Sequence, residues 1–456
     1  MLRFLFAFAL LIPLLSRAQT PIAEQQEADT LVVSLLTAAP GHQLYRIYGH
    51  TGVRVENTRN PKDDWAYNYG WFSFGQPGFV VKFIFGRTAY TMAQQSTAMF
   101  LSSHMRDDMA VTQQVLNLTP QQKEAVRHAL REPLLSNGFD REEFPVPNIA
   151  GGTDTLALLT PHWTYRYDFL YDNCTTRPVD IIIKAIEQSG EQVVYPTLAA
   201  STQQLTQRGM IHEFTTASPW YELGQDILLG RHVDHQHSVQ EMTRLNFLPT
   251  YAQNFFQQAQ IKDQEGRLRP LVLETRPLFP LVAQAQQPSL PFTPTLAMWG
   301  LLLLAAGLTY GEWRARKGSP AAQRAWRIWG LGFDTVLYAV LGLVGILLAV
   351  MVLWSEYAAV RPNFLLLLFN PLLLLLLPYR HWAARRGQRY WAAPLVGLGL
   401  VVLLGIGLLG LQYVPAALFP LTLTLLLRCD VVRFVQHYVD GRATAAPFLK
   451  ENQTVA

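Results

Sequence analysis

The sequence predicts an exported α+β domain followed by an all-α membrane domain of about five transmembrane helices. Three observations support this fold class. A short apolar run at the N-terminus has the pattern of an export signal. Strand-like and helix-like patterns occur in residues 20–269, and long apolar runs accumulate after about residue 295. Only 15% of the 456 residues are charged, against about 25% in ordinary globular domains. The composition therefore excludes a purely cytosolic enzyme.

The first 19 residues are predicted to be a signal peptide. Arg3 supplies the positive charge, residues 4–15 form the apolar run, and Ser16-Arg17-Ala18 resembles a small-residue cleavage site. Twelve apolar residues are too few for a bilayer span of roughly 20 residues, so we expect cleavage near Ala18 or Gln19. An uncleaved helix is the alternative, and in both cases the following domain, residues 20–269, is exported.

The membrane domain is predicted to cover residues 295–430. Its apolar runs are about 295–311, 333–354, 364–379, 393–411 and 414–428. Cations gather in two of the loops between these runs: Arg314, Arg316, Lys317, Arg324, Arg327, Arg380, Arg385, Arg386 and Arg389. Positively charged loops remain in the cytoplasm. We therefore expect a multi-pass protein of the bacterial inner membrane, with a periplasmic N-terminal domain and a cytoplasmic tail, residues 431–456.

The charge distribution argues against a nucleic-acid partner. Residues 20–293 contain 21 Lys and Arg against 27 Asp and Glu, although the whole chain carries a formal charge of +4. The basic excess therefore lies in the cytoplasmic loops and the tail, where it sets membrane topology. Residues 270–294 contain six prolines and are predicted to be a stiff linker that ends at the membrane.

The two cysteines are expected on opposite sides of the membrane. Cys174 lies in the exported domain and Cys429 at the inner end of the last apolar run, so they cannot pair within one chain. Two cysteines also exclude a disulfide-built scaffold. An unpaired exported thiol is a candidate reactive group, with an inert buried cysteine as the alternative.

Cys174 is predicted to lie at the start of a helix. Pro178 is tolerated only in a first helical turn, apolar residues follow at helical spacing, and Gly190 ends the pattern. The positive end of a helix favours a thiolate, so we expect a lowered thiol pKa. Free N–H groups at the same place can hold an oxyanion.

A nucleophilic thiol requires a base, and His50 has the best setting among nine exported histidines. It lies at a predicted strand start between Gly49 and Gly52, which leave room around the ring. In a second strand-like stretch, residues 65–70, Asn68 is a candidate to orient the imidazole. The alternative is a structural histidine and a turn residue.

No metal is expected. His232, His235 and His237 are close in sequence, but they lack helical spacing and have a polar, acidic setting. We interpret them as a solvated loop rather than a metal site.

The order of the two motifs carries a resemblance. Gly49-His50-Thr51 comes first and Asn173-Cys174-Thr175 follows, as in the circularly permuted branch of the NlpC-type, papain-like superfamily. More closely, residues 30–260 resemble the exported domain of the Lnb family, named after a lipoprotein N-acyltransferase of Bacteroides-type bacteria. The supporting residues are Tyr69-Gly70-Trp71-Phe72-Ser73-Phe74, Pro77-Gly78-Phe79, Gly86, Tyr90, Trp220, Gly224, Asp226, Gly230 and Asn246-Phe247-Leu248-Pro249.

The resemblance implies an acyl transfer at the outer face of the inner membrane. Cys174, assisted by His50, would attack a phospholipid ester and form a thioester. The α-amine of the lipidated N-terminal cysteine of a diacylated lipoprotein would then take the acyl group. Such a reaction requires no cofactor.

Five further residues are candidates for the site. We expect Tyr48, Asn173 and Thr175 to shape it and to cap the helix. Trp71 and Phe74 belong to an aromatic stretch, residues 71–90, which either lies against lipid and acyl chains or forms ordinary core.

Two other functions remain open. A membrane-tethered cysteine peptidase or amidase acting on cell-wall peptides would require a polar substrate groove, where this chain offers aromatic residues. A non-catalytic envelope scaffold would keep its function after Cys174→Ala.

Overall fold

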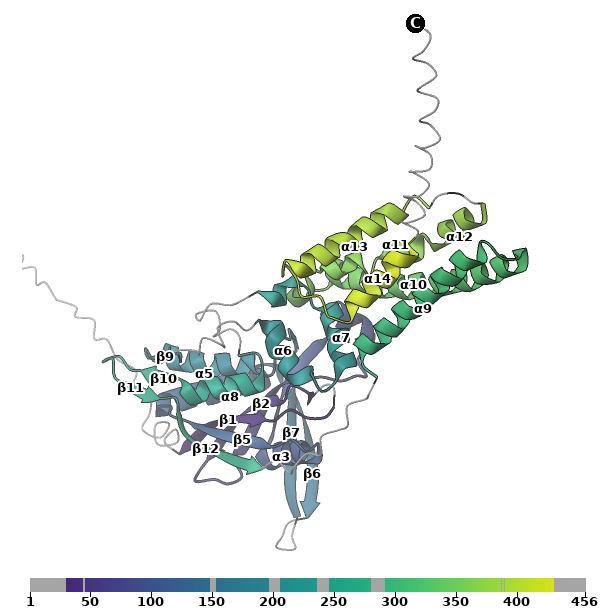
Figure 1. Ribbon diagram of the computed structural model, residues 1–456. Coiled ribbons are helices and arrows are strands. Elements are labelled where there is room, and N and C mark those ends of the chain that lie inside the picture. Colours follow the sequence, from purple (N-terminus) through teal and green to yellow (C-terminus); the bar gives the residue numbers. More distant parts are fainter. Residues whose placement is uncertain are drawn as a thin grey trace, which may run out of the picture.

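The computed structural model describes residues 30–43, 46–147, 153–196, 206–235, 246–279, 292–386, 388 and 390–429. A sheet domain comes first and a helical domain follows it (Figure 1). This arrangement confirms the mixed α/β domain and the helical membrane-like region predicted from the sequence. The predicted signal peptide and cytoplasmic tail, and also His237, lie outside the described residues.

The main sheet has nine strands among the described residues, and its order is β12-β5-β1-β2-β3-β4-β7-β6, with β8 paired to β4. All of these pairings are antiparallel. The strands are β1 Leu31–Ala38, β2 His50–Asn57, β3 Asp64–Trp71, β4 Ala89–Ser96, β5 Val111–Leu116, β6 Phe139–Pro147, β7 Thr153–Pro161, β8 Tyr165–Arg166 and β12 Val272–Phe279. A small second sheet contains β9 Gln192–Val194, β10 Gln260–Lys262 and β11 Leu268–Pro270.

Helices pack on both faces of the main sheet. The helices of this domain are α2 Phe79–Ile84, α3 Thr97–Arg106, α4 Pro120–Asn137, α5 Thr176–Gln188, α6 Gln207–Thr215, α7 Pro219–Leu228, η3 Arg231–Asp234 and α8 Pro249–Gln258. Val53 of β2 lies in one core cluster with Ile182 of α5. On the other face, Phe100 of α3 packs with Ala66 of β3. Because successive side chains of a strand point to opposite faces, the strands of the main sheet contribute side chains to both core clusters.

Several local predictions are confirmed. The strand-like stretches that begin at His50 and near Trp65 are β2 and β3. The spacing of Thr119 and Gln122 in the sequence also predicts a capping box, and the two residues form it at the start of α4. The pattern after Cys174 is α5, which stops before Gly190, where φ is 84°. Glycine tolerates this left-handed backbone conformation.

The structure corrects the linker prediction. Residues 272–279, which the sequence assigns to a linker over 270–294, form β12 and pair with β5 at the sheet edge. Proline is compatible with an edge strand because its missing N–H is not required there, and Pro277 lies opposite Thr112 in this pairing. Residues 280–291 of the predicted linker lie outside the described part of the chain.

The helical domain has fewer long spans than the five predicted. Its helices are α9 Pro294–Ala315, α10 Pro320–Trp354, η5 Ala358–Val360, η6 Phe364–Leu367, α11 Pro371–Leu375, α12 Leu377–Arg386, α13 Ala393–Leu408 and α14 Leu418–Arg428. Among the described residues, α9 and α10 are long and apolar enough to cross a membrane. The segments Phe364–Leu375 and Leu377–Arg386 meet at a bend of 64°, and they form a third candidate span if they are taken together. The helices α13 and α14 are shorter apolar helices, so five spans remain a prediction.

Arg380 is not a loop cation, as the sequence pattern suggested. It is buried and donates a 2.7 Å hydrogen bond to Asp334 of α10. Arg428 of α14 bonds the same carboxylate at 2.6 Å and Glu312 of α9 at 3.0 Å. Two arginines and two carboxylates thus balance their charges where four helices meet. Charged groups in apolar surroundings are tolerated when they pair in this way.

The two domains meet through backbone contacts. The N–H of Gly230 donates to Ala359 O at 2.8 Å, and the N–H of Arg231 donates to Pro362 O at 2.7 Å. A Cβ at position 230 would lie 2.4 Å from Pro362 O, so the close approach requires glycine. The loop after α10 therefore holds the segment that follows α7 in the sheet domain.

Candidate active site

Asn173 caps the helix that begins beside Cys174. Its Oδ1 accepts hydrogen bonds from the N–H groups of Thr175 at 2.7 Å and Thr176 at 2.9 Å. Its Nδ2 donates to Phe169 O at 2.7 Å and Phe247 O at 2.8 Å, so the cap is tied to two other segments. The sequence prediction that Cys174 lies within a residue of the helix N-cap is confirmed, because the N-cap is Thr175.

The Cys174 thiol lies in a polar corner at the start of β2. The backbone N–H of Thr51 and the side chain of Tyr167 both hydrogen-bond it, and Thr175 Oγ1 lies 3.8 Å from Sγ. Gly70 makes room for the residue: at φ 90°, its Cβ position would lie 3.3 Å from the Tyr167 ring and 3.6 Å from Cys174 Cβ. A larger side chain there would crowd the thiol.

His50 is the first residue of β2, and its imidazole is held on two sides. Asn68 hydrogen-bonds the ring with its side chain, and the His104 ring stacks at a centroid distance of 5.7 Å. Asn68 lies on the same sheet face because it pairs with Gly52. Its Nδ2 donates to Ala93 O at 3.4 Å, which leaves Oδ1 to accept from the imidazole. This arrangement selects one tautomer of His50.

Thr51 links the histidine to the cysteine. It follows His50 directly, its N–H reaches the Cys174 thiol, and its hydroxyl lies 3.0 Å from that of Thr175. Within the described part of the chain, no hydrogen bond joins the imidazole and the thiol directly. The structure thus brings Cys174 and Asn68 to the start of β2, Cys174 through the N–H of Thr51 and Asn68 through the His50 ring.

The charge states differ from the sequence expectation. Burial raises the pKa of the Cys174 thiol above its usual range, despite the hydrogen bonds that lower it. The helix N-terminus does not compensate, since Asn173 already takes the N–H groups of Thr175 and Thr176. Burial also lowers the pKa of His50 to about 4. At neutral pH the pair is therefore a neutral thiol and a neutral imidazole, not an ion pair.

The remaining predicted residues contact other parts of the structure or solvent. Tyr48 donates a 2.7 Å hydrogen bond to Gln225 Oε1, and its ring packs against Phe169 at 5.2 Å. Trp71, at the end of β3, and Phe74, in the following loop, are exposed. The structure therefore places Tyr48 against α7, whereas Trp71 and Phe74 lie on an apolar surface beside α2.

Tyr167 and His104 were missed by the sequence analysis. Tyr167 hydrogen-bonds the thiol, and its ring lies against Gly70. His104 donates from Nδ1 to Phe100 O at 2.7 Å, and burial lowers its pKa to about 3. Only the proximity of Tyr167 to the Cys174 motif could have indicated it, and no local pattern distinguishes His104 from other histidines.

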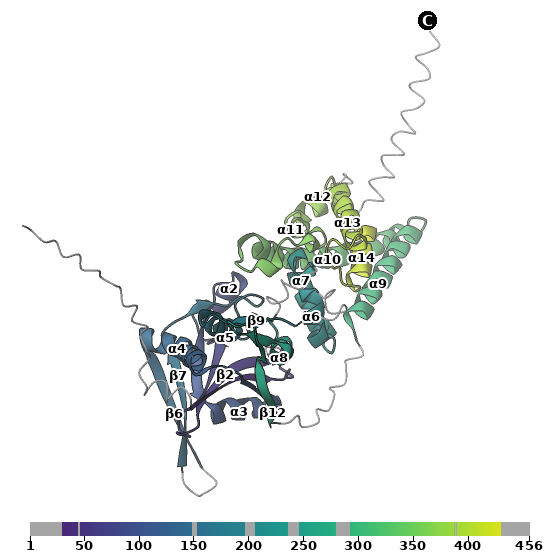
Figure 2. The ribbon, with the colours of Figure 1, turned by 90° about the vertical axis from the view of Figure 1, so that its left-hand side faces the viewer.

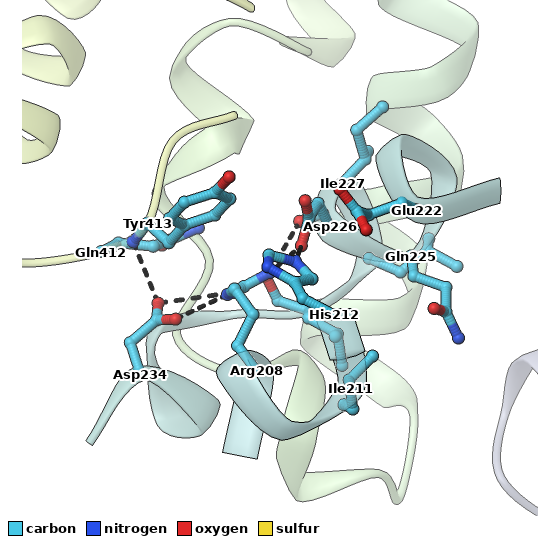
Figure 3. A network of polar contacts seen from close by, with 12 residues as sticks. Arg208, Ile211, His212, Glu222, Gln225, Asp226, Ile227, Asp234, Gln412 and Tyr413 are labelled. Carbon is cyan, nitrogen blue, oxygen red and sulfur yellow. Dashed lines mark hydrogen bonds and ion pairs between the residues drawn. The ribbon is translucent and has the colours of Figure 1, made fainter. Parts of the chain in front are cut away.

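Among the described residues, one group of side chains has the geometry to hold a metal ion. His212, Glu222 and Asp226 each place a possible ligand atom within 4.8 Å of the others. Arg208, however, donates to Asp226 Oδ1 at 2.7 Å, and His212 Nε2 lies 2.9 Å from the same oxygen (Figure 3). The guanidinium already supplies the positive charge that a metal would bring.

The histidine group chosen from the sequence is only partly described. His232 Nε2 lies 2.6 Å from the hydroxyl of Tyr171, an interaction between two side chains rather than part of a cluster of ligands. His235 is at the last described position before a gap in the structure, and His237 falls within that gap.

Comparison with protein families agrees with this organisation. A model described as the Lnb N-terminal periplasmic domain matches residues 18–202, and one described as the Lnb transmembrane domain matches residues 285–438. No curated protein and no solved structure matches the chain. The two family domains occur in the same order as the sheet domain and the helical domain. The chain therefore belongs to the Lnb family and is a membrane protein with a periplasmic N-terminal domain.

Proposed function

We propose that the protein is a lipoprotein N-acyltransferase that works through a Cys174 thioester. The acyl donor is a phospholipid, and the acceptor is the α-amine of the lipidated N-terminal cysteine of a diacylated lipoprotein. The observation that carries the proposal is the corner at the start of β2. There the Cys174 thiol contacts the N–H of Thr51, the residue that directly follows His50, and Asn68 orients the His50 ring. The order of the two motifs in the sequence, with His50 before Cys174, resembles that of a permuted papain-like enzyme and supports the proposal.

In the first half-reaction, neutral His50 accepts the proton of the Cys174 thiol as sulfur attacks the ester carbonyl. The carbonyl oxygen becomes an oxyanion, for which the donors around the thiol are the hydroxyls of Thr175 and Tyr167 and the N–H groups of Thr51 and Cys174. The C–O bond of the ester then breaks. Protonated His50 returns its proton to the leaving alkoxide, and a lysophospholipid departs.

In the second half-reaction, the α-amine of the acceptor attacks the thioester carbonyl. His50 removes a proton from the amine nitrogen and passes it to the departing Cys174 sulfur. An amide forms, the thioester C–S bond breaks, and the free thiol is restored. Because the pKa of His50 is about 4, the ring is neutral at neutral pH and has a nitrogen that can accept a proton in both steps.

The topology supports an encounter with lipid substrates. The loop after α10 binds the sheet domain, so the domain that carries the thiol is held at the end of a helix long and apolar enough to cross a membrane. We further infer a cleaved signal peptide over residues 1–19 and a cytoplasmic C-terminus. A cell-wall peptidase would instead require a polar groove at the thiol, and the rings of Tyr167 and Tyr90 stack there at 4.6 Å.

The test is mass spectrometry of lipoprotein N-terminal peptides from a strain that lacks its own N-acyltransferase. Wild-type protein should add an amide-linked acyl chain, Cys174→Ala should add none, and Cys429→Ala is the matched control because that buried cysteine lies at the end of α14. A free α-amine with all three proteins, each expressed and inserted, would refute the transferase. Equal acylation by wild type and Cys174→Ala would refute Cys174 as the nucleophile.

A further inference from the structure

The helix α2 buries none of its side chains. Five of its six residues are apolar, and the exposed fractions are 66% at Val80 and 58% at Val81. Phe74, in the loop that precedes it, is 70% exposed. Contiguous apolar surface of this kind marks a binding site for a partner or for a membrane.

The position of α2 is fixed by a contact with the helical domain. The N–H of Glu356 donates to Phe85 O at 3.0 Å, and Arg87 donates to the Glu356 carboxylate at 3.0 Å. Gly86 packs so closely that a Cβ would lie 3.3 Å from the backbone N of Glu356. Figure 2 shows α2 on the side of the sheet domain that faces the helices.

This contact determines the level of α2 relative to the membrane. Glu356 follows closely after Trp354, the last residue of α10, and α10 is the longest apolar helix among the described residues. Leu353 and Trp354 are exposed at its end. An exposed tryptophan at the end of an apolar helix is typical of the membrane–water interface. The apolar surface of α2 therefore lies at the depth of that interface.

A series of aromatic rings connects α2 with the thiol. Phe79 of α2 stacks on Phe72 at 5.6 Å, and Phe72 contacts Tyr90 at 5.0 Å. Tyr90 stacks on Tyr167 at 4.6 Å, and Tyr167 hydrogen-bonds the Cys174 thiol. The apolar surface thus continues from the exposed helix to the reactive group.

We propose that residues 71–84 insert into the outer leaflet of the membrane that surrounds the helical domain. The occupant of this surface is phospholipid hydrocarbon. The alternative occupant is a second copy of the protein, but contact with a second copy would not require α2 to be held at the end of a transmembrane helix. Lys82, exposed among the apolar residues, suits contact with lipid phosphates. The insertion of residues 71–84 does not depend on the proposed acyl-transfer reaction. The delivery of the donor acyl chain along the aromatic rings to Cys174 rests on the proposed function.

Insertion is tested with full-length protein in phospholipid nanodiscs. Val81→Cys, in a Cys174→Ser and Cys429→Ser background, carries an environment-sensitive fluorophore, and the lipids carry a nitroxide on the acyl chain. Leu135→Cys is the matched control, because Leu135 is 63% exposed but lies on α4, which Figure 2 shows farther from the helices. We expect lipid quenching at position 81 to be at least about twofold stronger than at position 135.

Two outcomes overturn the insertion. Equal quenching at both positions would mean that α2 stays in water. A blue-shifted emission at position 81 without lipid quenching would mean that protein covers it. If Val81→Cys does not fold, as judged by gel filtration, Phe74→Cys gives the same test at a 70% exposed position.

A second experiment separates insertion from chemistry. Val81→Glu should reduce acyl transfer from phospholipid several-fold, because a carboxylate at this depth is unfavourable, while Leu135→Glu leaves transfer at the wild-type level. The rate of Cys174 alkylation by iodoacetamide should be the same in both variants, which shows an intact site. Unchanged transfer by Val81→Glu overturns the delivery of the donor chain. Lipid quenching without any transfer by wild type would refute the proposed function and leave insertion standing.

Discussion

The hydroxyl groups of Thr51 and Thr175 lie 3.0 Å apart in a buried position. Each residue directly follows one of the two proposed reactive residues, His50 and Cys174, so this hydrogen bond aligns the strand that carries the base with the helix that carries the nucleophile. Geometry at the scale of an ångström governs such reactions, and the pair is therefore a positioning device for the site.

Thr175→Val tests this relationship. The substitution keeps the shape but removes the hydrogen bond, which should cost about 1 kcal/mol of stability and reduce kcat by about 10-fold or more with little change in KM. Thr175→Ser should restore the rate, because it retains the hydroxyl. Kinetics of acyl transfer in detergent or nanodiscs provide the measurement, and a Thr175→Val enzyme with wild-type kcat would contradict the assignment.

Asn68→Ala removes the group that orients His50. General acid–base catalysis contributes about 10²–10⁴-fold, and we expect a loss of kcat on the order of 10²-fold because the imidazole is no longer held in one tautomer. Asn68→Gln, which keeps an amide at a different reach, should recover only part of the rate. If Asn68→Ala loses stability in thermal unfolding but keeps its rate, Asn68 has a structural role alone.

The protonation states predict a specific pH dependence. The pKa of His50, about 4, lies below its usual range. The base is therefore neutral and active above about pH 4, and acyl transfer should fall as the pH drops through that value. The thiol pKa is raised, so thiolate is scarce at neutral pH. The rate of alkylation by iodoacetamide should therefore keep increasing as the pH rises beyond about 8.5, the usual pKa of a free thiol.

Intact-protein mass spectrometry of timed alkylation, from pH 5 to 10, gives this profile. Cys174→Ala serves as the control for modification elsewhere. A fast plateau at pH 5–7 would show a thiolate–imidazolium pair and contradict the neutral pair.

Gly230→Ala should loosen the contact between the two domains. A methyl group at this position would lie 2.4 Å from Pro362 O, and overpacking against backbone costs about 1–3 kcal/mol. Gly224→Ala is the matched control on α7, because nothing lies within 4 Å of its Cβ position. Limited proteolysis in detergent should cleave the Gly230→Ala protein between the domains faster than wild type or the control.

Chelators should not affect acyl transfer. The group most similar to a metal site, His212, Glu222 and Asp226, already holds the guanidinium of Arg208 at 2.7 Å from Asp226. Asp234, which Arg208 also contacts, accepts a 3.0 Å hydrogen bond from the N–H of Tyr413 in the helical domain. The network therefore joins the two domains (Figure 3). Loss of activity in EDTA that Zn²⁺ restores, together with bound metal in elemental analysis, would contradict this assignment.

Features with local causes were predictable from the sequence. The start of α5 follows from Pro178 and its end from Gly190, and the capping box of α4 follows from Thr119 and Gln122. The strand that begins at His50 follows from the alternation of Val53 and Val55. Each of these signals depends on residues within a few positions of one another, where backbone geometry and capping determine the conformation.

Features that depend on packing were not predictable in the same way. Arg380 has the sequence context of a loop cation, yet it pairs with Asp334 in a buried site. Residues 272–279 belong to the proline-rich stretch 270–294 that the sequence assigns to a linker, yet they form an edge strand. The pKa of Cys174 is raised because tertiary burial outweighs the effect of the helix end.

By itself, the sequence determined the division into an exported domain and an apolar domain, and the two motifs around His50 and Cys174. Only the tertiary structure decided what surrounds the thiol: the Thr51–Thr175 hydrogen bond spans 124 positions, and Tyr167 reaches the sulfur through the space left by Gly70. The physical reason is the separation along the chain over which each interaction acts. Hydropathy and capping act between neighbours in the chain, whereas burial and hydrogen bonding at a site depend on segments that meet only when the core has packed.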